Sequence, residues 1–425
     1  MTQSQKIILG VVIFVVVRLH LVFLGIIPGL RKGSPAPFSL EVWGFSNDDE
    51  AWREIIKQFQ KQYSYITVKY KSIDETDYQN MLLNRLAEDT GPDVFILKNS
   101  WLGNNKEKIY PLPQQALSLS INSFDTAFVD VAHEDLIDKD GVIYGIPLYV
   151  DSLALFYNKD LFNAAGVAQP PQTWDDFVAV SKLLTQISPA GDITRSGAAL
   201  GSGKNVEHAF EIASAMMLQK GDHMVTSTHT IDMNQGSEEA LSFYASFGDR
   251  TKQTFTWSSL LPNSLDAFAE EKTAMMFGFT KDIQNIKIKN PHINMGIAPF
   301  PQLQGTTKPS TLGNYGFATV SKLSSHQIDA WNFILFATSK ASAEQYIQMT
   351  GFAPARRDIL TEVPPPLDRE LFWRQALIAK SWPVPDYPST KKLFEDIIES
   401  VSARSVNVTQ AFNQLKEQMR LLVLH

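Results

Sequence analysis

The alternation of strand-like and helix-like segments restricts the fold of this chain more than any other feature of its sequence. Residues 39–43 predict a strand, and apolar side chains follow at helical spacing between Trp52 and Tyr63. Residues 66–70 and 93–97 predict two further strands, with a helix over 77–88 between them. Strands that alternate with helices form a sheet covered by helices on both faces, so the sequence predicts an α/β fold.

The alternation continues along the rest of the chain. About 390 residues follow the N-terminal segment, which is too many for one ordinary core and predicts two lobes. Ligands of such lobes bind beyond the carboxyl ends of the strands, so the loops there are candidate binding surfaces. The later predicted strands lie in 146–157, 274–279 and 295–298, and the later predicted helices are 174–186, 206–219, 236–247, 329–338, 341–349, 391–402 and 409–422.

The chain begins with a long apolar segment. Residues 7–27, as a helix, would extend roughly 31 Å, about the thickness of the hydrocarbon core of a bilayer. Arg18 and His20 interrupt the segment, and a central Arg costs roughly 2.5–3.5 kcal/mol on insertion, which the remaining apolar residues outweigh. We predict that residues 1–37 are a transmembrane helix with its linker, and a removed signal peptide or a buried core helix are the alternatives.

No convincing cleavage site follows this segment, and without cysteine the chain cannot carry a lipid on an N-terminal cysteine. An anchor that stays attached is therefore preferred to a removed signal. The predicted location is the cell membrane, with a single-pass anchor and the rest of the chain outside the cytoplasm.

Composition excludes several classes of function. Charged residues make up 20% of the chain, the net charge is -7, and no basic block occurs, so no nucleic-acid partner is expected. The absence of cysteine excludes disulfides, thiolate catalysis and cysteine-ligated metal. His133 and Glu134 lack a second histidine four residues on, and Gly201-Ser-Gly203 does not match a nucleophile elbow. We therefore predict a protein that is not an enzyme, with no catalytic residues, no metal and no cofactor.

Four segments carry a resemblance to a known family. They are YGIPLYVDSLALFYNKDLF (144–162), FAEEKTAMM (268–276), AWNFILFAT (330–338) and TGFAPAR (350–356). In order and spacing they resemble the sugar-type extracellular solute-binding proteins of ABC importers, the group that includes maltodextrin-binding proteins. The resemblance covers nearly the whole chain after residue 38.

The resemblance implies a two-lobed periplasmic-binding-protein type II fold, whose hinged cleft closes on a solute. The chain of this fold crosses between the lobes three times, and by position the crossings are expected near 149–152, 311–314 and 352–357. The first lobe would hold 38–148 and 315–351, and the second would hold 153–310 and 358–425. Hinge residues are expected to be Tyr149, Gly313 and Arg356, and for Arg356 a contact with the solute is the alternative.

The implied function is that of the substrate-binding component of an ABC-type importer, which captures a carbohydrate and delivers it to the permease. A receptor for a glycerol-phosphate ester or a peptide is the alternative, although phosphate would favour basic cleft loops and only Lys204 and Lys281 are nearby. An anchored carbohydrate-active enzyme is a further alternative, which needs two opposed carboxylates in the cleft. The expected partners are the solute and the permease subunits, and the protein is expected to be a monomer.

The polar ligand contacts are expected from four residues. Asp151 occupies the position of a carboxylate ligand in the family, and a carboxylate accepts hydrogen bonds from neighbouring sugar hydroxyls; bonding to hinge amides is the alternative. Asn47 and Asp48 follow the first strand, where the ligand-contacting loop of the family lies, although Asp48 or Asp49 must cap the next helix. Asn205 precedes the helix 206–219 and either contacts the solute or caps that helix.

Aromatic rings are expected to bind the C–H faces of a sugar. Trp43 lies within the first predicted strand and is assigned to the core, as are Trp174 and Trp331. The candidates, each of which could instead pack in the core, are Trp101, Phe279, Tyr315 and Tyr387.

Overall fold

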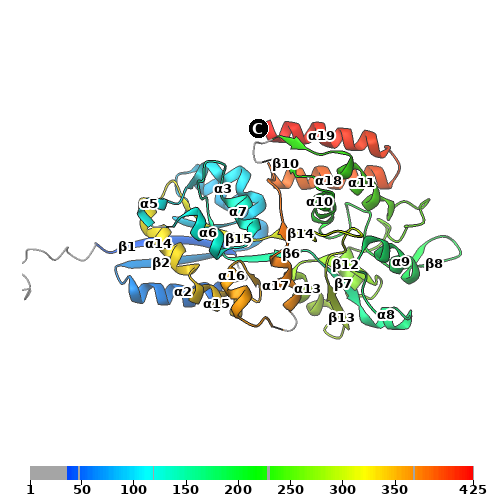
Figure 1. The fold of residues 1–425 in the computed structure, drawn as a ribbon, viewed down its shortest axis with the longest axis horizontal. Coiled ribbons are helices and arrows are strands. Elements are labelled where there is room, and N and C mark those ends of the chain that lie inside the picture. Colours follow the sequence, from blue (N-terminus) through cyan, green and yellow to red (C-terminus); the bar gives the residue numbers. More distant parts are fainter. Residues whose placement is uncertain (1–35, 46–47, 118, 227–229, 367–368, 425) are drawn as a thin grey trace, which may run out of the picture.

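The computed structural model describes residues 36–45, 48–117, 119–226, 230–366 and 369–424. Residues 1–35 of the predicted anchor and the predicted ligand residue Asn47 lie outside this part of the chain. Among the described residues, no helix combines the length and apolar character that crossing a membrane requires. The described chain forms an elongated molecule with two α/β halves (Figure 1).

The first half is built on a sheet of mainly parallel strands, which we call the first sheet. β1 (Phe38–Phe45) pairs in parallel with β2 (Ile66–Ile73) and with β3 (Val94–Lys98). β15 (Gly316–Ser321) comes from much later in the chain and lies antiparallel beside β3. Two short strands pair with β15, and they are β4 (Ile109–Tyr110) and β5 (Ile146–Pro147).

Helices cover both faces of the first sheet. The crossovers through α2 (Asp49–Gln62) and α3 (Glu75–Ala87) run in opposite directions along the sheet, which places the two helices on opposite faces (Figure 1). The buried Tyr78 hydroxyl fixes α3 to the sheet, because it donates to the Trp43 carbonyl (2.9 Å) and accepts from the Ile96 N–H (3.1 Å). The other helices of this half are η1 (Asn99–Trp101), α4 (Leu102–Asn105), η2 (Lys106–Lys108), α5 (Gln114–Leu117), α6 (Ile121–Ala127), α7 (Asp130–Leu136), α14 (Gln327–Ala337) and α15 (Lys340–Thr350).

The second half is built on a smaller antiparallel sheet, the second sheet. Its central strand β7 (Ala154–Asn158) pairs with β12 (Met275–Gly278) and β13 (Met295–Ala298). An aromatic core centred on Trp174 packs beside it, with Phe277 at 5.8 Å and Phe300 at 5.2 Å between ring centroids. The remaining elements of this half are α8 (Lys159–Ala164), α9 (Trp174–Leu184), β8 (Gln186–Ile187), β9 (Ile193–Arg195), α10 (Ala209–Gln219), β10 (Met224–Val225), β11 (Ile231–Asp232), α11 (Gln235–Ser246), α12 (Ser264–Ala269) and α13 (Thr280–Lys289).

A third sheet of short strands, the linking sheet, joins the two halves. β6 (Tyr149–Ser152) pairs antiparallel with both β14 (Thr311–Asn314) and β16 (Ala353–Pro354). β17 (Ala379–Lys380) pairs in parallel with β14. In the chain, β6 lies between β5 of the first sheet and β7 of the second, and β14 leads to β15. The chain therefore passes between the halves through the linking sheet, near the centre of Figure 1.

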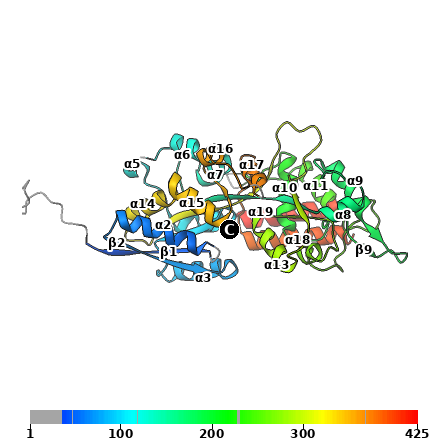
Figure 2. The ribbon, with the colours of Figure 1, turned by 90° about the horizontal axis from the view of Figure 1, so that it is seen from below.

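The C-terminal part of the chain packs on the second half. α18 (Tyr387–Ser402) and α19 (Val408–Leu424) contact each other and α11, and Figure 1 shows them in orange and red beside α10 and α11. Figure 2 shows the same arrangement from below, with α18 and α19 on the half that carries α8 and α9. The helices α16 (Arg357–Glu362) and α17 (Glu370–Ala376) connect the linking sheet to this end of the chain.

The strands and helices predicted from the sequence are present, with boundaries shifted by a few residues. The segment 146–157 is divided into β5, β6 and β7. The sequence predicted no element between β3 and β5, where the structure has several helices, the longest being α6 and α7 with 7 residues each. Helices of about two turns contain too few residues to show a clear 3.6-residue period, which explains the omission.

Close backbone packing at Gly201 holds the C-terminal helices on the second half. Gly201 has a φ of +99°, and a Cβ there would lie 2.2 Å from the backbone nitrogen of Gly248. The Ser402 hydroxyl, at the end of α18, donates to the Gly201 carbonyl (2.5 Å). A side chain at Gly201 would therefore strain its own backbone and separate these segments.

Gly201→Ala is expected to lower the free energy of unfolding by more than about 3 kcal/mol, because backbone strain and overpacking act together. Gly166→Ala is the matched control, since Gly166 has a φ of +72° and no atom of the described residues lies within 4 Å of an added Cβ. Gly166→Ala is therefore expected to lower the free energy of unfolding by only about 1–2 kcal/mol, the cost of a left-handed backbone for alanine. Urea unfolding followed by tryptophan fluorescence measures both losses, and equal losses would contradict a role for the close contact.

Candidate functional site

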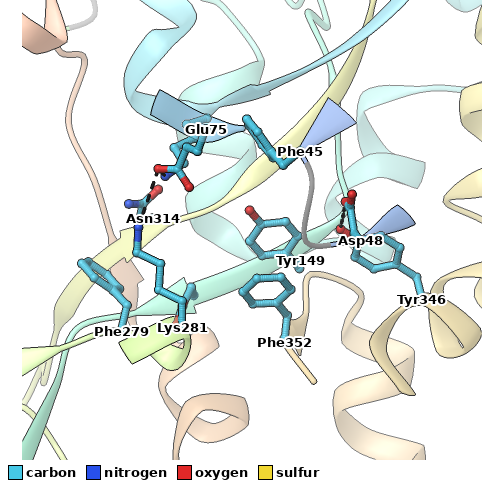
Figure 3. A pocket seen from close by; sticks show the side chains of 11 residues that line it. Phe45, Asp48, Glu75, Tyr149, Phe279, Lys281, Asn314, Tyr346 and Phe352 are labelled. Carbon is cyan, nitrogen blue, oxygen red and sulfur yellow. Dashed lines mark hydrogen bonds and ion pairs between the residues drawn. The ribbon is translucent and has the colours of Figure 1, made fainter. Parts of the chain in front are cut away.

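A pocket lies where the linking sheet meets the two halves (Figure 3). The first half contributes residues from β1, β3, α3 and α15 and Asp48, which precedes α2, and the second half contributes Phe279 and Lys281 at the start of α13. The lining combines aromatic and charged side chains. The lining residues are Phe45, Asp48, Glu75, Lys98, Tyr149, Asp151, Phe279, Lys281, Asn314, Tyr346 and Phe352.

Asp48 lines this pocket as a buried acceptor. Its carboxylate accepts hydrogen bonds from Trp52 Nε1 (3.0 Å), the Tyr70 hydroxyl (2.8 Å) and the Tyr346 hydroxyl (2.7 Å). Burial raises the pKa of Asp48 to about 6, although these three donors oppose the rise. Asp48 stands at the N-cap position of α2, but its side chain makes no capping hydrogen bond. The Asp48 carboxylate therefore does not cap α2. It is bonded instead to side chains of α2, β2 and α15.

Asp151 connects the linking sheet to the second half. Its Oδ1 accepts from the Ser152 N–H (2.9 Å), the Thr280 N–H (3.1 Å) and the Thr280 hydroxyl (2.8 Å). Burial raises the pKa of Asp151 to about 6 against the opposing effect of these donors. Asp151 therefore lines the pocket, as a ligand residue would, and also makes the amide contacts that were the alternative. The bonds to backbone amides are therefore present, and a contact with the solute stays a prediction.

Glu75 joins two lysines across the pocket. Lys98 Nζ is hydrogen-bonded to Glu75 Oε1, and Lys281 Nζ lies 3.6 Å from the same oxygen. Glu75 begins α3 in the first half, whereas Lys281 belongs to α13 in the second, so this contact spans the cleft (Figure 3). Burial favours a higher pKa for Glu75, but the two ammonium groups outweigh it and hold the pKa below its usual value.

The aromatic residues of the pocket form a stacked group beside these charges. The ring of Tyr149 is parallel to that of Phe352, with centroids 4.0 Å apart, and lies 6.3 Å from that of Tyr346 (Figure 3). Phe279 packs on the other side, with its ring edge-to-face with His208 at 4.9 Å. Flat rings beside carboxylates suit a solute that has apolar faces and hydroxyl edges.

A second, smaller cavity adjoins the first and shares Asn314 with it. The predicted residue Tyr387 lines this second cavity, where its hydroxyl donates to Glu211 Oε1 (2.5 Å). The other lining residues are Asn99, Ser100, Phe210, Glu211, Leu312, Gly313, Ser381, Trp382 and Val384. We refer to the pair as the first cavity and the second cavity.

The two cavities are small in this arrangement of the halves. Their volumes are about 50 and 30 Å³, whereas pockets for drug-sized ligands typically have several hundred Å³. Neither cavity therefore has room for a drug-sized solute in this arrangement of the halves. A movement of the halves apart would break the contact between Glu75 and Lys281, because its partners lie on different halves.

Three predicted ligand residues have packing roles instead of lining either cavity. Trp101 is buried, and its ring is nearly parallel to that of Tyr78 at 6.1 Å. Tyr315 is fully buried and its hydroxyl donates to Asp135 (2.8 Å). Asn205 neither caps α10 nor lines a cavity, because it accepts from Trp257 Nε1 (2.9 Å) and donates to the carbonyls of Ser258 and Leu261.

The predicted hinge residues lie on or beside the linking sheet. Tyr149 begins β6, and Gly313 lies in β14, where an added Cβ would meet the Ala379 Cβ at 3.1 Å. Arg356 follows β16 and forms a two-bond contact with Asp358 (3.0 and 2.7 Å), while its Nη1 donates to the Thr338 carbonyl (3.0 Å). These bonds tie the third crossing to the end of α14, away from the two cavities.

Sequence reasoning missed Glu75, Lys98 and Glu211. Each lies in a regular element, at the start of α3, the end of β3 and the first turn of α10. Charged residues at such places are usually solvated, so no sequence pattern marked these three. Among the described residues, no group of three histidines or carboxylates is arranged to hold a metal ion.

The sequence is similar to those of known solute-binding proteins. A family model described as "Bacterial extracellular solute-binding protein" matches residues 54–370. A binding protein of Brucella abortus is 24% identical over 317 residues, which cover 72% of this chain and 73% of the relative. The melibiose/raffinose/stachyose-binding protein of Bacillus subtilis is 21% identical over 331 residues, covering 75% of this chain and 73% of the relative.

Solved structures share the fold. The sugar-binding protein MalE of Xanthomonas citri superposes with a TM-score of 0.75 and 22% identity, covering 91% of this chain and 98% of that one. A cyclo/maltodextrin-binding protein in complex with maltotetraose gives a TM-score of 0.74 and 20% identity, covering 92% and 98%. The chain therefore has the α/β periplasmic-binding-protein fold.

Buried carboxyl groups make the stability of the protein depend on pH. Burial raises the pKa of Asp48, Asp135 and Asp151 to about 6 each, above the usual 3.8. These groups bind protons more tightly in the folded protein than in the unfolded chain, so they favour folding when protonated. Their contribution to the free energy of unfolding therefore falls as pH rises from about 4 to about 6.

Asp151→Asn is expected to weaken this pH dependence, because an amide does not ionise and its oxygen can accept the bonds made by Ser152 and Thr280. Between pH 4 and pH 7 the change in unfolding free energy should differ from that of the unsubstituted protein by about 2 kcal/mol. Urea unfolding at the two pH values measures it. An unchanged pH dependence would mean that Asp151 titrates alike in the folded and unfolded states.

Proposed function

The chain belongs to the bacterial extracellular solute-binding protein family, and from this membership we propose that it captures a carbohydrate in its cleft and delivers it to an ABC permease. The resemblance found in the sequence is thus confirmed. As a member of this family the protein is a solute receptor rather than an enzyme, and its binding part lies outside the cytoplasm.

The observation that carries the carbohydrate assignment is the lining of the first cavity. Tyr149, Tyr346 and Phe352 line it with aromatic rings, and Asp48 and Asp151 place carboxylates next to them. A sugar presents an apolar C–H face and a rim of hydroxyl donors, which such a lining matches. Relatives of this chain are named for binding sugars, including the multiple sugar-binding protein of Streptococcus mutans and the maltodextrin-binding protein of Bacillus subtilis.

An anionic solute, such as a glycerol-phosphate ester, is the second candidate. Lys98 adds a second ammonium group to Lys281 in the first cavity, which the sequence did not predict. Both lysines, however, already contact Glu75. One carboxylate thus offsets part of their charge, and the neutral sugar remains the preferred solute.

We propose that binding closes the cleft by rotation about the linking sheet. The bodies that move would be 38–148 with 315–351 and 153–310 with 358–425, as the family resemblance implies. β6 is short and pairs with the short strands β14 and β16, so the ends of these strands can absorb a rotation while the two larger sheets stay intact. Solute contacts from both halves would then favour the closed form, which the permease recognises.

Isothermal titration calorimetry with a panel of neutral oligosaccharides and glycerol phosphates tests the solute. A sugar is expected to bind with micromolar affinity, roughly -8 kcal/mol, and to raise the melting temperature. The assignment fails if no oligosaccharide binds, and binding of a glycerol phosphate alone would establish the second candidate.

Asp151→Asn in the same assay is expected to weaken sugar binding by about tenfold, because a charge-assisted hydrogen bond becomes a neutral one. Asp175→Asn is the control, since Asp175 is exposed at the start of α9 and makes the same chemical change away from the cleft. If Asp151→Asn binds normally but loses stability, Asp151 has only a structural role.

We further propose that residues 1–37 hold the receptor at the membrane as a single-pass anchor. The long apolar segment supports this, as does the absence of a cysteine that could carry a lipid. A tether of this kind raises the effective concentration of the receptor near its permease. Lys6 precedes the segment and Arg31 and Lys32 follow it, so the outward placement of the binding part depends on the family rather than on flanking charge.

Cell fractionation and protease digestion test the anchor. The full-length protein is expected in the alkali-washed membrane fraction and is expected to be digested when protease is added to cells with a permeable envelope but an intact inner membrane. A chain that begins at Phe38 behind a cleavable signal should be recovered in the soluble extracytoplasmic fraction. Full-length protein found there as well would show that the segment is removed.

A further inference from the structure

Two polar contacts join the halves, one beside each cavity. Beside the first cavity, Lys281 Nζ of α13 lies 3.6 Å from Glu75 Oε1 of α3. Beside the second cavity, Asn104 Nδ2 of α4 donates to Oδ2 of Asp386 (2.5 Å), the residue that precedes α18. The helices α3 and α4 belong to the first half, whereas α13 and α18 lie on the second. Both contacts are therefore made only when the halves are close together.

The backbones of the two halves also meet, at Gly103 in α4. An added Cβ at Gly103 would lie 2.7 Å from the carbonyl oxygen of Val384 and 3.3 Å from that of Pro385. Trp382, in the same segment as these two carbonyls, packs on Phe210 of α10 with ring centroids 5.9 Å apart, which holds the segment on the second half. A side chain at Gly103 would therefore push the halves apart.

The close approach at Gly103 has a larger effect than the ion pair. The side chains of Lys281 and Glu75 are 42% and 36% exposed, and exposed ion pairs contribute little to stability. Overpacking of backbone against a side chain is much more costly. Gly103 lies in a right-handed helix, a backbone that alanine adopts at least as readily as glycine. Alanine there would thus oppose the contact between the halves without straining its own helix.

The arrangement that these contacts hold has no room for a solute. The first cavity has a volume of about 50 Å³ and the second about 30 Å³. A cavity that binds benzene has roughly 150 Å³, so neither cavity can hold even one sugar ring. In the first cavity, Lys98 and Lys281 both contact Glu75 across the space that a ligand there would need. A solute-bound form must therefore be wider between the halves than this one.

We propose that these contacts hold a self-closed form of the receptor, in which the halves meet without a solute, and that this form competes with solute binding. Only molecules in a wider form can then take up a solute. The apparent dissociation constant equals the intrinsic constant divided by the fraction of binding-competent molecules, so weaker contacts between the halves give tighter binding. The self-closed form is independent of the proposed function, and only the competition rests on it.

Double electron–electron resonance on the full-length protein in detergent measures the distance between the halves. The chain contains no cysteine, so two spin labels can be attached at Asn80→Cys in α3 and Gln284→Cys in α13, which are both exposed positions. Without a solute, a major population at a short distance and a minor population at a longer distance are expected. A saturating solute should replace the short distance by an intermediate one.

Gly103→Ala in this labelled protein is expected to raise the ratio of the longer to the shorter population by at least about fivefold, which corresponds to the lower end of the cost of overpacking. Gly236→Ala is the matched control. Gly236 also lies in a helix, and an added Cβ there would lie 2.9 Å from the Cβ of Lys220, which belongs to the same half. The control introduces similar overpacking within one half and should leave the distances unchanged.

Asn104→Asp tests the polar contact beside the second cavity. A carboxylate at position 104 would face Asp386, and the repulsion is expected to raise the population at the longer distance. Adding Asp386→Asn should restore the short distance, because an amide there can donate to the new carboxylate. Asparagine caps a helix as well as aspartate does, so α18 stays capped in the double variant. In the part of the chain that the structure describes, the linings of the two cavities include neither residue.

Calorimetry in a detergent without a sugar headgroup, with the sugar that the panel identifies, tests the competition. Gly103→Ala is expected to bind that sugar about two- to fivefold more tightly than the unsubstituted protein, because more of its molecules are competent to bind. Gly236→Ala should bind with unchanged affinity. The double variant at positions 104 and 386 should return to the affinity of the unsubstituted protein.

Several outcomes would overturn the inference. One is a single long distance in the unsubstituted protein without a solute, and another is a short distance that Gly103→Ala leaves unchanged. If Gly103→Ala opens the protein but binds the sugar more weakly, the contact belongs to the solute-bound form and does not compete with it. If Gly103→Ala does not fold, Asn104→Asp and its rescue decide in its place. If no sugar binds, the proposed function fails, whereas the distances still decide whether the self-closed form exists.

Discussion

Pairing within the linking sheet is the constraint on which the cleft depends. β6 is hydrogen-bonded to β14 and β16, which holds three segments that are far apart in the sequence side by side. Tyr149 and Asp151 stand two residues apart on β6 and face the same cavity, together with Asn314 at the end of β14. A slip of one residue in this pairing would turn both β6 side chains to the opposite face, so the register of a four-residue strand decides which side chains line the first cavity.

The carboxylates around the cleft differ in the number and kind of their hydrogen-bond partners. Asp48 is satisfied by three neutral donors, Asp151 by two residues, Ser152 and Thr280, and Glu75 by two lysines. Much of the acceptor capacity of these groups is thus used to hold the cleft together. Glu211 differs because its Oε2 has no hydrogen-bond partner in the part of the chain that the structure describes. Buried carboxylates can therefore be necessary for the shape of a site without each being a ligand.

Four of the predicted ligand residues line the two cavities, but the sequence did not predict the direction of every side chain. Asp48 precedes α2, Phe279 follows β12, Tyr387 begins α18, and Asp151 lies within β6. Trp101, Tyr315 and Asn205 also lie near the ends of regular elements. Their side chains nevertheless point into the protein, where they contact Tyr78, Asp135 and Trp257. Position in a loop predicts proximity to a cleft, whereas the direction of a side chain depends on its packing partners. Lys98 and Glu75 do line the first cavity, although no sequence pattern predicted it. Their role follows from the packing of α3 and β3 beside α13.

The sequence by itself determined the α/β alternation and the family. These follow from local periodicity and from segments whose order along the chain is fixed. Only the tertiary structure decided which polar groups are buried together, since Asp48 bonds Tyr346 and Asp151 bonds Thr280 across 298 and 129 positions of the sequence. The physical reason is that a buried polar group is stabilised by whatever donors packing brings to it, and no local pattern encodes those donors.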